Sequence, residues 1–395
     1  MAVKSVKDLD LTNKKVLVRV DFNVPVVDGK ITDITRITAS VPTIDYILKQ
    51  KGTSVILMSH LGRPKGGEKK AEFSLAPVGK KLSEVMNKKV IMAPDCIGEA
   101  VEKLVKESKP GDIILLENVR YYEEEEKNNP EFAKKLAKLG DVYINDAFGT
   151  AHRAHASTEG ISKFVSSSAA GLLIEKEIAF MEPILKNPKQ PFVAVIGGAK
   201  VSSKIAVLES LLKTCSAMVI GGGMSYTFLK AMGKKIGKSL LEEDYIDTAK
   251  KFLKAAADKK VEIVFPLDRV CAKEFSENAE PIYIENNEIP DDLTGMDIGP
   301  KSIEAIRKCL ANAQTIVWNG PMGVFEFKNF QKGTLAVAEM IANSKAITVI
   351  GGGDSVSAIN EFGYADKVSH VSTGGGASLE YLEGKPLPGI VALEK

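Results

Sequence analysis

The sequence predicts an α/β protein with two doubly wound parallel-sheet domains that face each other across a hinged cleft. Short apolar runs alternate with amphipathic helical stretches along the chain, which is typical of βαβ units. The runs are almost continuously apolar, as in strands that are buried on both faces of a parallel sheet. A chain of 395 residues is also too long for one hydrophobic core. We therefore expect each domain to be Rossmann-like.

Apolar runs in the first half of the chain predict buried strands over residues 15–20, 54–58, 112–116 and 141–144. Asp28-Gly29 predicts a hairpin turn. The charge run Glu123–Glu126 is interpreted as the solvated start of a helix, because that is a commoner use of such a run than a metal site.

The second half of the chain repeats this alternation. Apolar runs predict strands over 192–196, 217–220, 262–265, 315–318 and 346–350, and helical patterns lie at 244–257 and 302–311. Two prolines within 186–191 end a helix that begins near residue 171. We expect an N-terminal domain over 1–170, an interdomain helix and linker over 171–191, and a C-terminal domain over 192–376.

Composition excludes several classes of protein. The formal net charge is +2, which argues against a nucleic-acid partner. No stretch approaches the roughly 20 apolar residues that span a bilayer, so no membrane partner is expected. The four cysteines are scattered without metal-site spacing, which is typical of reduced thiols. We expect a soluble cytoplasmic protein.

Basic side chains follow or flank the predicted strand ends of the first half. They are Arg36, Arg63, Arg120 and Arg153, accompanied by His60, His152 and His155. A guanidinium makes bidentate hydrogen bonds to carboxylate and phosphate groups. Converging arginines repel one another unless an anion lies between them. These neighbours also oppose a metal cation. The pattern therefore favours a small anion with several oxygens.

Glycine-rich turns follow the strands of the second half. Segment 197–204 contains Gly198, Lys200 and Lys204, and we expect it to open a helix. The two lysines would then be one turn apart and could face the same phosphate. The spacing fits neither a Walker A loop nor a Gly-x-Gly-x-x-Gly fingerprint. A tight turn with two surface lysines is the alternative interpretation.

The segment 351–355 delivers Asp354 and Ser355 to a helix start. Asp354 could be an N-cap, or it could hold Mg²⁺ together with substrate phosphate oxygens, and the adjacent glycines favour the metal. Asn319 could orient a phosphate, and Glu326 could accept hydrogen bonds from ribose hydroxyls.

Taken in order, these segments resemble the phosphoglycerate kinase family over essentially the whole chain. The matching segments are 18–25, 60–64, 117–120, 145–155, the turns at 197, 319 and 351, and 373–376. The resemblance implies reversible phosphoryl transfer from 1,3-bisphosphoglycerate to ADP, giving 3-phosphoglycerate and ATP, with Mg²⁺ bound beside the nucleotide. It also implies a monomer whose last residues, 377–395, pack on the N-terminal domain.

By analogy with this family, each domain binds one substrate. The acid is assigned to Asp21, Asn23, Arg36, His60, Leu61, Gly62, Arg63, Arg120 and Arg153. The nucleotide is assigned to Gly198, Lys204, Gly222, Gly295, Asn319, Glu326, Gly352, Gly353, Asp354 and Ser355, with Asp354 as the metal ligand.

The acid needs no general base, because its carboxylate is ionised near neutral pH. Stabilisation of the negative charge on the transferred group is assigned to Arg36, Lys200, Lys204 and the backbone N–H groups of Gly374 and Gly375. Arg36 and Lys200 belong to different predicted domains, so we expect cleft closure to assemble the site.

Two other functions remain as alternatives. A nicotinamide-dependent dehydrogenase would share the two-domain α/β architecture, but its fingerprint is missing. A non-catalytic binding protein would explain the arginines without requiring Lys200, Lys204 and Asp354 together.

Overall fold

The computed structural model describes residues 3–64 and 69–394. The chain divides into two compact units, the first formed by Met1–Ala179 with Pro386–Lys395 and the second by Phe180–Lys385. The division falls inside helix α6 (Leu172–Lys186). Every helix in the described ranges is too short or too polar to span a bilayer.

The first unit is built on a parallel sheet with the strand order β5-β6-β4-β1-β7-β8. Its strands are β1 (Lys15–Arg19), β4 (Ser54–Met58), β5 (Val90–Met92), β6 (Ile113–Leu115), β7 (Val142–Asn145) and β8 (Ser168–Ala170). The predicted hairpin is confirmed, with β2 (Val26–Val27) and β3 (Lys30–Ile31) joined by Asp28 and Gly29 at φ values of 50° and 73°. Positive φ at both turn residues matches the twist of the flanking strands.

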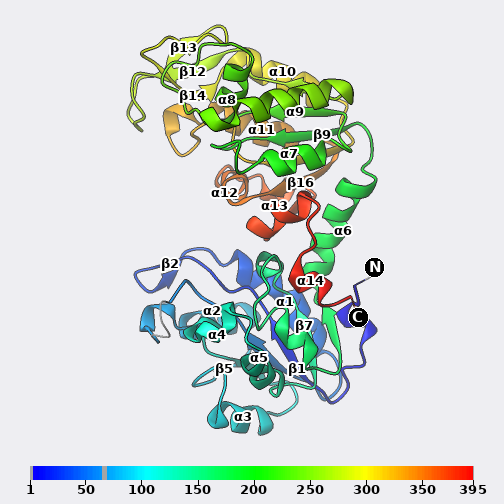
Figure 1. Ribbon diagram of the computed structural model, residues 1–395. Helices are drawn as coiled ribbons and strands as arrows, with labels where there is room; N and C mark the ends of the chain where they lie inside the picture. Colours follow the sequence, from blue (N-terminus) through cyan, green and yellow to red (C-terminus); the bar gives the residue numbers. More distant parts are fainter. Residues whose placement is uncertain (1–2, 65–68, 395) are drawn as a thin grey trace. The chain divides into compact units, whose positions relative to one another are not determined.

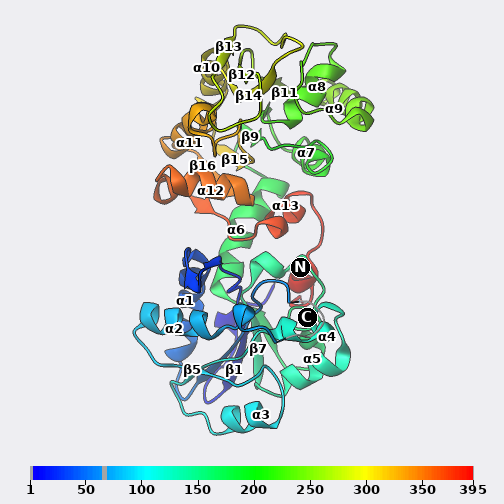
Figure 2. The ribbon, with the colours of Figure 1, turned by 90° about the vertical axis from the view of Figure 1, so that its left-hand side faces the viewer.

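Helices cover both faces of this sheet (Figure 2). The helices of this unit include α1 (Thr35–Leu48), α2 (Ala76–Met86), α3 (Glu99–Lys106), α4 (Glu123–Glu126), α5 (Pro130–Ala137) and α14 (Pro388–Val391). Figure 2 shows α1 and α2 on one side and α5 on the other. Ile44 of α1 and Leu82 of α2 share one core cluster with Val18 and Leu57 of the sheet. The sheet is therefore covered by helices on both sides, as in doubly wound proteins.

The second unit contains another parallel sheet, with the order β11-β10-β9-β15-β16-β17. Its strands are β9 (Phe192–Ile196), β10 (Ala217–Ile220), β11 (Glu262–Val264), β15 (Thr315–Asn319), β16 (Ile347–Gly351) and β17 (His370–Val371). Numbered along the chain, this order is the 3-2-1-4-5-6 arrangement of nucleotide-binding sheets. The order reverses between β9 and β15, where such sheets bind their ligands.

Two separate cores lie on the faces of the second sheet. They are covered by α7 (Ile205–Leu211), α8 (Met224–Ala231), α9 (Ile246–Asp258) and α13 (Gly376–Leu382) on one face, and by α10 (Pro300–Leu310), α11 (Lys332–Ala342) and α12 (Gly353–Glu361) on the other (Figure 1). Within β9, Ala194 belongs to the first core and Val195 to the second, as expected when successive side chains alternate between faces. The predicted class of two parallel α/β sheets is confirmed.

A small antiparallel sheet in the second unit was not predicted. Its order is β13-β12-β14, formed by β12 (Arg269–Ala272), β13 (Ile282–Ile284) and β14 (Thr294–Ile298). Gly295 and Met296 of β14 line a cavity described below, so this addition bears directly on the site.

The structure corrects the expectation for residues 377–395. Residues up to Lys385 belong to the second unit, because Leu382 of α13 is fully buried against Val207 and Leu211 of α7. The segment from Pro386 belongs to the first unit, where the N–H of Gly389 donates to the carbonyl oxygen of Ala151 at 2.8 Å.

The interpretation of Glu123–Glu126 as the solvated start of a helix is wrong for one residue. These residues do form helix α4, but Glu125 is completely buried. Its carboxylate accepts hydrogen bonds from the N–H and Oγ of Ser157, at 2.9 and 2.5 Å. A partner 32 positions away cannot be read from a local charge run.

Candidate active site

The carboxyl edge of the first sheet carries a connected set of polar groups. Arg36, in the first turn of α1, donates from Nη1 to Oδ2 of Asp21 at 2.8 Å. Oδ1 of Asn23 accepts from the N–H of Gly62 at 2.8 Å. Arg120 donates from Nη1 to the carbonyl oxygen of Gly62 at 2.9 Å. Loops that follow three different strands are thereby held together at one edge of the sheet.

The remaining basic residues of the first unit differ in exposure. Arg153 is half-buried and donates from Nε to Nε2 of His152 at 3.2 Å, whereas Arg63 is exposed. Nε of Arg120 lies 3.2 Å from a carboxylate oxygen of Glu126. Burial lowers the pKa of Arg120 to about 10, with Glu126 acting in the opposite direction. The guanidinium therefore stays charged near neutral pH.

Two predicted residues of this edge contribute little through their side chains. Leu61 is buried in the core of the first unit, and its carbonyl oxygen accepts from Nδ2 of Asn118 at 2.7 Å. Gly62, at a φ of 63°, has no side chain to offer. Any contact that these residues make with a ligand would come from the backbone.

In the second unit, the loops after β9, β10 and β15 pack against one another at the point where the strand order reverses. Gly198 donates its N–H to the carbonyl oxygen of Pro321 at 3.1 Å, and Gly222 donates to that of Met322 at 3.1 Å. Gly222 has a φ of 66°, and a Cβ atom there would lie 2.5 Å from the nitrogen of Gly198. Only glycine allows this approach of the two backbones.

Lys204 and Asn319 meet beneath these loops. Nζ of Lys204 donates to Oδ1 of Asn319. Since an ammonium group only donates, the amide oxygen must face the lysine, and Nδ2 must point away from it. Nδ2 is buried and finds no hydrogen-bond partner among the described residues. Burial lowers the pKa of Lys204, opposed by the charges of Asp354 and Glu383. A phosphate oxygen would satisfy both the cation and the unpaired amide.

Asp354 and Ser355, two predicted residues at the start of α12, differ in burial and in hydrogen bonding. Gly352 occupies the N-cap position with a φ of 87° and no side-chain cap bond, and Gly353 opens the helix. Ser355 is buried, donating from Oγ to Gly351 O at 2.9 Å and accepting from the N–H of Gly320 at 2.6 Å. Asp354 is exposed and is not a cap. Ser355 therefore fixes the loop, whereas the carboxylate of Asp354 remains available.

A cavity of about 270 Å³ lies beside these loops. Predicted residues that line it are Gly198, Gly222, Gly295, Glu326 and Asp354. Apolar side chains, which the sequence did not reveal, complete it: Tyr226, Leu240, Phe275, Met296, Met322 and Val324. A Cβ atom on Gly295 would lie 2.1 Å from Oη of Tyr226, so the wall requires glycine there. Apolar walls with glycine backbone and carboxylates at the edge fit a flat base linked to a charged tail.

The prediction that Lys200 and Lys204 share a helical turn is wrong. Helix α7 begins only at Ile205, and the preceding residues form turns. Ser202 donates from its N–H and Oγ to Glu242, at 3.1 and 2.5 Å, and Ser203 donates from Oγ to Lys200 O at 2.9 Å. Serine side chains compete with the helix for backbone groups in this way. Lys200 is consequently exposed, and Lys204 alone of the two lysines contacts Asn319 in the described residues.

The glycine pair 374–375 precedes α13. Gly375 has a φ of 52°, which favours glycine. The N–H of Gly374 donates to Oγ of Ser372 at 3.1 Å, so this amide would have to change partners before it could bind a phosphate.

Sequence reasoning also missed Arg19, a fully buried arginine at the end of β1. It donates from Nη2 to Nδ1 of His60 at 3.1 Å. The available signal was a charged residue inside the otherwise apolar run 15–20.

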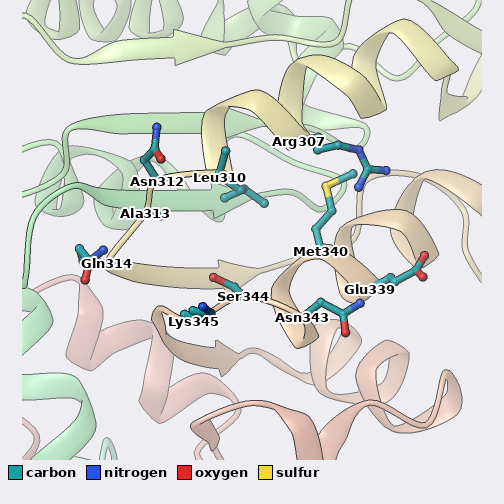
Figure 3. Close-up of a pocket in the computed structure, with 11 residues that line it drawn as sticks. Arg307, Leu310, Asn312, Ala313, Gln314, Glu339, Met340, Asn343, Ser344 and Lys345 are labelled. Carbon is teal, nitrogen blue, oxygen red and sulfur yellow. The ribbon is translucent and has the colours of Figure 1, made fainter.

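A larger hollow, of about 780 Å³, lies at the opposite edge of the second sheet (Figure 3). It is lined by the ends of α10 and α11 and by the residues before β15 and β16, with Arg307 and Glu339 at one end and Gln314 and Lys345 at the other. None of the residues predicted for the site lines it.

Comparisons with known proteins agree on one family. The family model described as phosphoglycerate kinase matches residues 6–385. Proteins named phosphoglycerate kinase from Borrelia hermsii and Borrelia turicatae are 57% and 58% identical over 395 residues, with 100% of both chains covered in each case. A solved phosphoglycerate kinase from Coxiella burnetii has a TM-score of 0.90 at 44% identity, covering 99% of each chain. One from Pyrococcus horikoshii has a TM-score of 0.85 at 32% identity, covering 99% of this chain and 98% of its own.

Proposed function

The chain belongs to the phosphoglycerate kinase family, and on that premise we propose that its two units each bind one substrate of a single phosphoryl transfer. The protein catalyses the reversible transfer of a phosphoryl group from 1,3-bisphosphoglycerate to ADP, giving 3-phosphoglycerate and ATP, in glycolysis. One observation supports the assignment of the nucleotide to the second unit. Lys204 contacts Asn319 beside a cavity that Asp354 and Glu326 help to line.

The acid is assigned to the basic edge of the first unit. Arg36, Arg63, Arg120 and Arg153 offer several charged donors, which suit a ligand carrying both a carboxylate and a phosphate. Asp21 orients Arg36, and Asn23 holds the loop at Gly62. His60 would add a donor among the arginines.

The nucleotide is assigned to the second unit. Its base would occupy the apolar part of the cavity, and Glu326 would accept from the ribose hydroxyls. Its phosphates would lie against the loops at Gly198, Gly222 and Gly352, with Lys204 and the unpaired Nδ2 of Asn319 as donors.

Asp354 suits Mg²⁺, because its carboxylate is exposed at a glycine turn and does not cap α12. The described residues contain no cluster of three or more His, Cys, Asp or Glu side chains that could hold an ion. Mg²⁺ commonly takes one or two carboxylates together with substrate phosphate oxygens and waters. When bound, the ion would neutralise charge on the nucleotide phosphates.

The chemistry needs positioning more than proton transfer. In the ATP-consuming direction, a carboxylate oxygen of 3-phosphoglycerate bonds to the γ-phosphorus of ATP while the bond from that phosphorus to the bridging oxygen of ADP breaks. The acid is already ionised, so no base is required. We assign stabilisation of the transferred group to Arg36, Lys200, Lys204 and the amides of Gly374 and Gly375.

Transfer between ligands held on separate units requires the units to close during the reaction, and we propose a hinge motion for this step. Small-angle scattering is expected to show a smaller radius of gyration when 3-phosphoglycerate and Mg-ATP are both present than with either ligand alone. An unchanged radius in the ternary complex would contradict hinge closure.

A coupled assay with 3-phosphoglycerate, ATP and Mg²⁺ tests the proposed function. We expect ADP release that depends on the acid and disappears when EDTA removes the metal. Tight binding of both ligands by folded protein without turnover would instead support the non-catalytic binding protein. We further propose that the enzyme acts as a monomer in the cytoplasm, where its free cysteines would stay reduced.

A further inference from the structure

A fully buried arginine lies directly beside His60 at the basic edge of the first unit. Nη2 of Arg19 lies 3.1 Å from Nδ1 of His60. The same guanidinium donates from Nη1 to the carbonyl oxygen of Val20 at 2.5 Å and from Nε to Oγ of Ser157 at 2.8 Å. Three partners in different directions fix the plane of the guanidinium group.

This contact determines which ring nitrogen of His60 carries the proton. Arginine has donors and no acceptor, so Nδ1 of His60 must accept. A neutral imidazole that accepts at Nδ1 carries its hydrogen at Nε2. A protonated imidazole would place an N–H at Nδ1 against the N–H of Arg19, so the contact also opposes the charged form.

The arginine is itself held by a buried carboxylate. Oγ of Ser157 accepts from Arg19 and donates to Oε1 of Glu125 at 2.5 Å. Glu125 is completely buried, and its carboxyl group is linked to the arginine through a single hydroxyl group. The result is a continuous row of hydrogen bonds from Glu125 through Ser157 and Arg19 to His60.

The charges around His60 act in the same direction as this contact. Burial lowers the pKa of His60 well below its ordinary value, and Arg19, Arg120, Arg36 and His155 lower it further. These groups come from β1, from the loop after β6, from α1 and from the loop after β7. An arginine cluster therefore contains one neutral ring that can donate a hydrogen bond.

We propose that Arg19 is a positioning residue that fixes His60 as the neutral Nε2–H tautomer, with Ser157 and Glu125 bracing the arginine. In this form His60 donates from Nε2 to an oxygen of the anionic acid without adding a further charge to the cluster. The proposal rests on the assignment of 3-phosphoglycerate to this edge. It adds a residue that acts on the substrate through another side chain.

Nitrogen NMR of the full chain without substrates tests the tautomer directly. The protein has four histidines, and a His60→Gln spectrum identifies the ring signals of His60. We expect Nδ1 without a proton and Nε2 with one, unchanged from about pH 8 to about pH 5. A proton on Nδ1, or an imidazolium at about pH 6, would overturn the proposal.

Two substitutions distinguish the contact of Arg19 with His60 from the hydrogen bond between Arg19 and Ser157. Arg19→Met should give a mixture of tautomers, and the pKa of His60 should rise but stay below its ordinary value, because burial and the other arginines still lower it. Ser157→Ala, the matched control, leaves the guanidinium beside His60 and should keep the wild-type tautomer. Retention of that tautomer in Arg19→Met would show that other surroundings set it. If Arg19→Met does not fold, the wild-type spectrum still decides whether Nδ1 of His60 accepts from Arg19, and a proton on Nδ1 would overturn the proposal.

The pH dependence of substrate binding gives a second readout. In Arg19→Met, KM for 3-phosphoglycerate should rise about tenfold at about pH 8. The ratio of variant to wild-type KM should then fall toward low pH, because His60 takes up a proton at a higher pH in the variant than in the wild type. Using the ratio cancels titration of the substrate's own phosphate. A ratio independent of pH would contradict the proposal, and KM for ATP should not change.

The two hypotheses fail separately in these experiments. Wild-type protein without kinase activity would refute the proposed function whatever the tautomer of His60. An active wild-type enzyme with the other tautomer would refute only the role of Arg19.

Discussion

Arg36→Ala is expected to lower kcat for phosphoryl transfer by about a thousandfold. The side chain stands at the start of α1, held by Asp21 at 2.8 Å, with about a third of its surface exposed. It therefore presents a fixed positive charge at the edge assigned to the acid. Alanine removes this charge from the place where negative charge gathers during transfer.

Steady-state kinetics with both substrates varied would measure this effect. Arg307→Ala is the matched control, because Arg307 lies on a helix of the other unit and pairs at 3.4 Å with the exposed Glu304. That variant should retain full activity. A raised KM for the acid at unchanged kcat would assign Arg36 to binding that is equally strong in the ground state and the transition state.

Lys204→Met is expected to reduce kcat/KM for ATP by about a thousandfold while leaving the folded protein at least as stable. The activity should fall because the ammonium beside Asn319 is the buried cation assigned to the nucleotide phosphates. Stability should hold because burial opposes the charged form of Lys204, whose pKa is lowered in the folded state. Methionine fills a similar volume without that cost, which offsets the loss of the hydrogen-bond donor to Oδ1 of Asn319.

Kinetics and thermal unfolding on the same preparations test this pair of effects. Lys213→Met provides the control, because Lys213 is exposed just after α7. It should change neither activity nor melting temperature. Equal losses of activity in the two lysine variants would remove Lys204 from its assigned role. A sharp fall in melting temperature for Lys204→Met would show that the lysine serves the fold.

The longer buried strands could be predicted from sequence because their apolar runs are continuous. The shorter β5, β8 and β17 have only two or three residues each, too few to form a clear run. The antiparallel strand β13 is partly exposed, so its side chains carry little hydrophobic signal. Its partners on β12, such as Arg269 opposite Ile284, lie across a long irregular connection that gives no hairpin signal.

Part of the candidate site could be predicted because its residues directly follow predicted strands. Asn319 and Lys204 meet because parallel strands end at one edge of a sheet, which the pattern of strands already implied. The shared turn of Lys200 and Lys204 failed, because Ser202 and Ser203 hold the backbone in turns instead of a helix. Contacts such as that of Glu125 with Ser157 depend on packing between distant segments, which no local pattern encodes.

Crossed equilibrium binding tests most directly the claim that each unit binds its own substrate. Calorimetry would compare 3-phosphoglycerate and Mg-ATP on wild-type, Arg36→Ala and Lys204→Met protein. Arg36→Ala should bind the acid about tenfold more weakly with unchanged nucleotide affinity, and Lys204→Met should show the reverse. Loss of both ligands in either folded variant, or no change in either affinity, would contradict the assignment of one substrate to each unit.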